Sequence, residues 1–168
     1  MKPLHKACCS SLAQVSLILT KLEFHKDETL YQRSGISRHV RHILDHYLAL
    51  KNGLENNHID YNQRNRDGKV ESDIEFATEV ISYLNNWLGT LEDNNLKLTI
   101  ESEIDIDEQI NASFESNQDR ELLNIINHTI HHTAYIKLIA NKFEIEIPEQ
   151  IGIAPSTATY LREESIGN

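Results

Sequence analysis

The chain has 168 residues, with 26 acidic and 16 basic side chains, and its formal net charge is −10 at pH 7. This length fits a single domain, and a hydrophobic content of 39% argues against intrinsic disorder. A field this negative repels phosphate backbones and anionic membranes, so nucleic acid is a poor partner. No apolar run is long enough to span a membrane, and the first residues lack the apolar core of a signal peptide. We therefore expect a cytoplasmic protein.

The chain has two cysteines, Cys8 and Cys9, which are adjacent. Neighbouring cysteines are awkward to join in a disulfide, and they lack the CxxC spacing of a zinc site. We expect two reduced thiols near the start of a helix, with no part in the chemistry of the protein.

Four amphipathic helical patterns follow one another along the chain. The first runs from about residue 8 to residue 24, and the second from after Gly35 to about residue 57. A polar loop leads to the third, which covers about residues 72 to 91. The fourth starts near residues 117 to 120 and ends before Pro148. Each carries apolar residues at spacings of three and four, which is typical of a helix with one buried face.

The segments outside these helices are less regular. "LKLTIESEID" (96–105) alternates apolar and polar residues, and "INASFES" (110–116) follows it as a partner for a short β-hairpin. The tail over residues 147–164 is typical of a loop laid across the helices. The patterns together predict an all-α fold, a four-helix bundle over residues 1–168 with a long crossover and a short hairpin between the third and fourth helices.

Histidines crowd two of the predicted helices. On the fourth, His128 and His132 are four residues apart, so both imidazoles can point to one spot at the edge of the apolar face. His131 lies further from that face, and we expect it to reach solvent or to support a ligand.

The second predicted helix carries His39, His42 and His46 on one arc beside its apolar stripe, and periodicity does not choose among them. Two HxxxH pairs on separate helices predict a mononuclear metal site rich in histidine. The simpler alternative is that these imidazoles are solvated or hydrogen-bonded without any metal.

Other metal motifs do not fit. The chain has no HExxH, the zinc-protease motif. A carboxylate di-iron bundle needs ExxH on each of two helices, and only Glu55 with His58 has that spacing. A haem or hemerythrin-like site would need further ligands that these spacings do not supply.

The histidine segments resemble those of the DinB-like (YfiT-like) metal-binding proteins. "HILDH" (42–46) resembles the H-x-x-D-x segment of that family's second helix, and "HTIHH" (128–132) the H-x-x-x-H of its last long helix. "REL" (120–122) and "APST" (154–157) resemble one of its branches. Helix order and chain length also fit, so the resemblance covers nearly the whole chain.

The resemblance implies that His42, His128 and His132 hold a divalent metal and leave positions for water or substrate. Zinc is the leading candidate, with nickel and iron as alternatives, because imidazole discriminates weakly among them. Characterised members of the family include transferases and isomerases that use a low-molecular-weight thiol. The resemblance therefore also implies a small-molecule substrate and a thiol cosubstrate.

Two hypotheses follow. The first is a metal-dependent transferase or hydrolase that activates a thiol or water at the three-histidine site. The second is a metal-binding or interaction protein without turnover, whose site is structural or vestigial. The sequence places no carboxylate next to an open metal position, so the catalytic residues stay unassigned.

Several residues near the predicted ligands have two interpretations. Asp45 can orient a ligand imidazole, although its angle on the helical wheel favours the surface. Arg64 and Arg66 can bind an anionic substrate or simply tether a loop. Tyr47 and Tyr135 can donate to a metal-bound group or pack within the bundle.

The third predicted helix carries an aromatic pair, Tyr83 and Trp87, at a spacing of four residues. We expect this pair to join two copies of the chain as a homodimer, and the alternative is that both rings pack inside the bundle.

Overall fold

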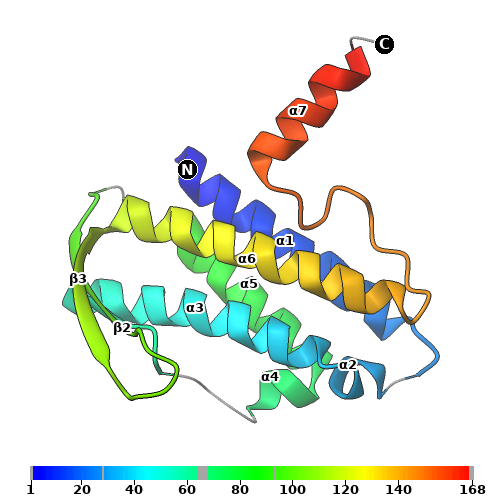
Figure 1. The fold of residues 1–168 in the computed structure, drawn as a ribbon, viewed down its shortest axis with the longest axis horizontal. Helices are drawn as coiled ribbons and strands as arrows, with labels where there is room; N and C mark the ends of the chain where they lie inside the picture. Colours follow the sequence, from blue (N-terminus) through cyan, green and yellow to red (C-terminus); the bar gives the residue numbers. More distant parts are fainter. Residues whose placement is uncertain (1, 28, 64–67, 93, 167–168) are drawn as a thin grey trace.

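The computed structural model describes residues 2–27, 29–63, 68–92 and 94–166. These residues are mainly helical, as predicted, and form seven helices and three strands. The four long helices are α1 (Pro3–Glu23), α3 (Ile36–Asn56), α5 (Ile74–Thr90) and α6 (Gln118–Asn141), and Figure 1 shows them side by side. The shorter helices are α2 (Leu30–Arg33), α4 (Lys69–Ser72) and α7 (Pro155–Ile166).

The four long helices close a ring around one core. α1 packs against α5 and α6, and α3 packs against the same two helices. α1 and α6 run in one direction, and α3 and α5 run in the other (Figure 1). Because α3 and α5 are parallel, the chain between them has to return along the length of the helices.

The core side of α3 shows how the apolar pattern builds this arrangement. Its fully buried side chains recur at spacings of three and four residues, so they form one stripe along the helix. That stripe consists of Ile36, Val40, Ile43, Tyr47 and Leu50.

No helix in the described ranges is long and apolar enough to cross a bilayer.

A three-stranded sheet covers one end of the helices, and it corrects the all-α expectation. β2 (Lys97–Glu103) and β3 (Asn111–Asn117) pair antiparallel with Ile100 opposite Phe114, which confirms the predicted hairpin. β1 (His58–Asp60) pairs with β2 in parallel, so the strand order is β1-β2-β3. The sequence did not predict β1, because a strand of three residues is too short to show an alternation of apolar and polar side chains. β1 forms through its pairing with β2, which is distant in the sequence.

The tail prediction is correct in its first half and wrong in its second. Ile147 and Ile151 are buried, and the Gly152 N–H donates to Gln14 Oε1 of α1 at 3.1 Å. Gly152 has φ +75°, and a Cβ there would lie 2.6 Å from Ala134 Cα, so only glycine fits this crossing. Residues 155–164, expected as part of that loop, lie in α7, which stands away from the other helices (Figure 1). α7 buries no apolar stripe, so the helical periodicity that a sequence reveals is missing there.

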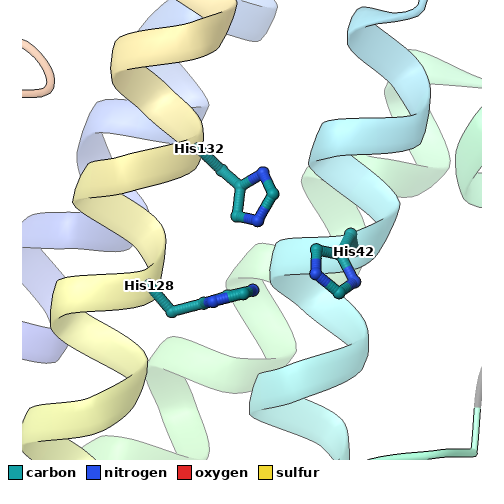
Figure 2. Close-up of side chains that lie close together, drawn as sticks. All are labelled: His42, His128 and His132. Atoms are coloured by element: carbon teal, nitrogen blue, oxygen red, sulfur yellow. The ribbon is translucent and has the colours of Figure 1, made fainter. Parts of the chain in front are cut away.

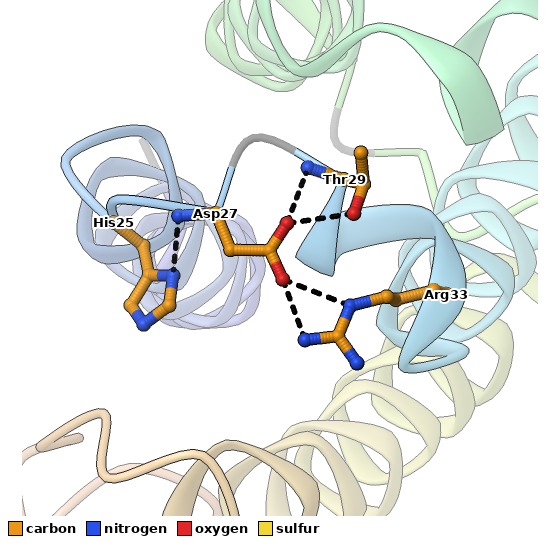
Figure 3. Close-up of polar contacts among 4 residues, drawn as sticks. All are labelled: His25, Asp27, Thr29 and Arg33. Carbon is orange, nitrogen blue, oxygen red and sulfur yellow. Dashed lines mark hydrogen bonds and ion pairs between the residues drawn. The ribbon is translucent and has the colours of Figure 1, made fainter.

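The link between α1 and α3 is organised by one carboxylate, Asp27 (Figure 3). Its Oδ1 accepts from the Thr29 N–H at 3.0 Å, and its Oδ2 accepts from Arg33 Nε at 2.9 Å. The hydrogen bonds from Thr29 and Arg33 lower the pKa of Asp27 to about 2. The guanidinium of Arg33, the last residue of α2, also lies over the Phe143 ring, 5.3 Å from its centre, so this link contacts the chain just after α6.

We expect Asp27→Asn to lower the melting temperature at pH 7, because the folded protein stabilises the ionised carboxylate. A lowered folded pKa adds stability that is complete above the ordinary pKa of 3.8 and is lost as the pH falls toward about 2. The difference between the two proteins should therefore shrink from pH 4 to pH 2 in thermal melts followed by circular dichroism. The exposed Glu108→Gln serves as the control. A difference that is the same at pH 2 and pH 7 would contradict this account.

Candidate metal centre

Two neighbouring helices bring the predicted ligands together. α3 supplies His42, and the adjacent α6 supplies His128 and His132 one turn apart (Figure 2). One ring nitrogen of each residue lies within 4.8 Å of those of the other two. All three side chains are half-buried. The structure therefore brings together the three residues that the sequence and the family resemblance selected.

The donor set fits a divalent metal ion. Zinc binds imidazole nitrogen at about 2.0–2.1 Å, so two nitrogens on one ion lie at most about 4 Å apart. The present spacing needs only small side-chain adjustments to reach that range. The His42 ring is inclined by 69° to His128 and by 82° to His132, and the His128 and His132 rings are inclined by 61°, so no two of the three rings stack. Nitrogen ligands of this kind suit zinc, nickel or iron.

Three further histidines extend the group. We call the six imidazoles between α3 and α6 the histidine cluster: His39, His42, His46, His128, His131 and His132. Within it the His46 ring stacks on His128 at 4.0 Å and meets the edge of His42 at 4.7 Å. His131 is exposed, as predicted, and its ring lies beside His132 and Tyr135.

His39 orients His132. Their Nδ1 atoms are 2.8 Å apart and share a hydrogen bond, so Nε2 is the His132 nitrogen left for a metal. Figure 2 shows one ring nitrogen of His132 directed toward the space between His42 and His128. Burial lowers the pKa of His39, and the charge of His131 lowers it further. A neutral His39 can share its Nδ1 in this way, and its ring also stacks on Tyr135 at 5.9 Å.

A buried carboxylate lies at the other side of the cluster, and sequence reasoning missed it. Tyr61, just after β1, stacks on His46 at 4.9 Å and donates its hydroxyl to Glu121 Oε2 at 2.8 Å. Ser116 Oγ donates to the other oxygen of Glu121. Burial and the Glu121 charge raise the pKa of Tyr61, which keeps the phenol protonated. The available signal was the spacing of seven residues between Glu121 and His128, which puts both on one face of α6.

The remaining candidates have other roles. The prediction that Asp45 lies at the surface was wrong: it is buried, and Arg41 Nη1 donates to its carboxylate at 3.2 Å. Tyr47 is fully buried, and its hydroxyl bonds to Ser11 Oγ at 2.6 Å, so it packs within the helices. Tyr135 is half-exposed at the rim of the cluster. Arg64 and Arg66 lie outside the described residues.

Both cysteines are free, in agreement with the prediction. Cys8 is fully buried on α1, and its Sγ lies 3.7 Å from the carbonyl oxygen of Leu122. Burial and the neighbouring Cys9 raise the pKa of the Cys8 thiol to about 12. A thiol that stays protonated is a poor nucleophile, so Cys8 belongs to the core.

Comparison with known proteins gives one partial match. FK506-binding protein 5 of Rhizopus delemar is 30% identical over an alignment of 112 residues that covers 63% of this chain and 28% of that protein. The chain thus spans little more than a quarter of the length of this relative. No protein-family model and no solved structure match the chain. The resemblance to DinB-like proteins therefore stays a prediction that rests on the histidine motifs.

Replacing His42, His128 or His132 by alanine should remove most of the bound metal. Two imidazoles rarely hold a divalent ion against solvent and chelators. Metal analysis of protein made without a histidine tag measures this loss. Circular dichroism should show an unchanged helix content, because the core does not depend on the ion.

Alanine variants of two other histidines serve as controls for that experiment. His131→Ala should keep its metal, because His131 is exposed. His46→Ala separates an open site from a closed one: an open three-ligand site keeps its ion, whereas a four-histidine site loses it. Full metal content in the His128 or His132 variant would mean that the cluster is only a polar contact between helices.

His39→Ala should weaken metal binding by about 10- to 100-fold, which is the usual cost of removing a group that orients a ligand histidine. Competition with a chromophoric chelator measures this affinity. His39→Gln, which can still offer an acceptor, should recover part of the loss. The exposed His131→Ala is the matched control, and equal affinities for the His39 and His131 variants would refute the orienting role.

Proposed function

We propose that the chain is a DinB-like divalent-metal protein that acts on a small molecule as a transferase or hydrolase, with a low-molecular-weight thiol or water as the nucleophile. One observation carries the proposal: ring nitrogens of His42, His128 and His132, from two helices, lie within 4.8 Å of one another. The histidine motifs supply the link to the family, and zinc, nickel or iron fits the donor set.

The residues around the three ligands support catalysis at this site. A divalent ion on three neutral imidazoles would supply Lewis acidity, which lowers the pKa of a bound thiol or water. His39 holds the His132 ring in one orientation through its Nδ1. The protonated Tyr61 hydroxyl donates a hydrogen bond to Glu121 Oε2, and the Tyr61 ring stacks on His46, which stacks on His128. The Tyr61 phenol and the Glu121 carboxylate are the candidates for moving a proton during a reaction.

One observation favours the alternative, a metal-binding protein without turnover. The centre of the His46 ring lies 4.7 Å from that of His42 and 4.0 Å from that of His128, so a movement of this side chain would bring a fourth imidazole to the three whose nitrogens lie within 4.8 Å of one another. Four protein ligands close a zinc site and leave no position for a substrate, so such a metal would be structural.

A screen for turnover tests the proposal. Tag-free protein loaded separately with zinc, nickel and iron is mixed with a panel of small thiols and electrophiles, and with simple hydrolase substrates. We expect one combination to be consumed by the loaded protein and not by His42→Ala, which should lack the metal. If the thiols, electrophiles and hydrolase substrates all remain unchanged at full metal occupancy, the structural alternative holds.

A further inference from the structure

β3 is an edge of the sheet with which no other described strand pairs. The strand order β1-β2-β3 leaves β1 and β3 as the two edges, and β1 has only three residues. β3 has seven, and Figure 1 shows it at the outer margin of the protein. Every second residue of an edge strand turns its N–H and C=O outward, ready to pair with another strand.

The sequence of β3 lacks the features that usually protect such an edge. Proteins block edge strands with lysine, proline, bulges or very short strands. β3 reads "NASFESN" and has neither lysine nor proline. Its single charged residue is Glu115. In a chain with a net charge of −10, β3 therefore carries little of the charge that would repel a second copy.

Phe114, the middle residue of β3, has an exposed ring. It lies opposite Ile100 of β2, so both side chains are on the same face of the sheet. Ile100 is 7% exposed, whereas Phe114 is 50% exposed. The helices thus cover this face at β2 and leave it open at β3.

We propose that β3 is a self-association edge, through which two copies of the chain pair antiparallel about Phe114 into a continuous six-stranded sheet. In this register Phe114 faces Phe114 of the second copy, and each ring covers the open half of the other. Ser113 then faces Glu115 of the second copy. No two like charges lie directly opposite each other, and a strand paired with itself about its central residue gives the closed two-fold symmetry of a dimer.

The aromatic pair on α5, which the sequence indicated for dimerisation, is a weaker candidate. Tyr83 is 51% exposed, but Trp87 is half-buried and packs against the core. The Lys51 ammonium already lies over the Tyr83 ring, 5.4 Å from its centre. The Trp87 ring therefore packs in the core, and the Tyr83 ring already contacts the Lys51 side chain.

The register gives two neighbouring variants with opposite outcomes. Phe114→Lys puts two lysines directly opposite each other and removes the aromatic pair, so the dimer dissociation constant should rise at least about tenfold. Ser113→Lys adds the same charge one residue away, opposite Glu115 of the second copy, and should keep or tighten the dimer. Sedimentation velocity over a concentration series measures both, with circular dichroism to establish that each variant is folded.

Hydrogen exchange supplies an independent measurement on the unchanged protein. The outward amides of β3 should exchange more slowly as the protein concentration rises, because pairing covers them. Tyr83→Lys should leave both the mass and this protection unchanged. A monomer at all concentrations, or a dimer that survives Phe114→Lys and dissociates in Tyr83→Lys, would overturn the proposal.

Discussion

The contact between α3 and α6 is the constraint on which the rest of the site depends. Two packed helices normally bury apolar side chains where they face each other, yet here the five half-buried imidazoles of the cluster fill part of that contact. Buried polar nitrogens are costly unless they find partners, and the helix backbone is already committed to its own hydrogen bonds. The imidazoles therefore bond and stack among themselves, as His39 does with His132. The same arrangement offers ring nitrogens to a metal.

α3 can carry these histidines because a different face of the helix supplies the apolar side chains that pack in the core. Ile43 and Tyr47 directly follow His42 and His46 in sequence, a step of about 100° around the helix, and both are fully buried in the core. A helix with two such faces separates stability from chemistry. Losing an ion or an imidazole on one side leaves the packing on the other side intact, which is why the ligand variants can be studied as folded proteins.

The parts that sequence reasoning found are those with local periodic signals, and the parts it missed depend on distant partners. Spacings of three and four residues located the long helices, and the HxxxH spacing located His128 and His132. A helical wheel gives an angle but no neighbour, so it could not choose His42 over His39, and it misplaced Asp45, which Arg41 holds in a buried position. The bond between Tyr61 and Glu121 joins residues 60 positions apart, and no local pattern reveals it.

The sheet and the histidine cluster share a single run of hydrogen bonds and stacked rings. Ser116 in β3 donates to Glu121, which accepts from Tyr61, and the Tyr61 ring stacks on His46. β3 thus fixes one end of a path whose other end is the imidazole stacked on His128. The short strand β1 acts in the same way, because it sets the backbone position of Tyr61 through its pairing with β2. The sheet therefore positions groups that the helices alone would leave without a fixed orientation.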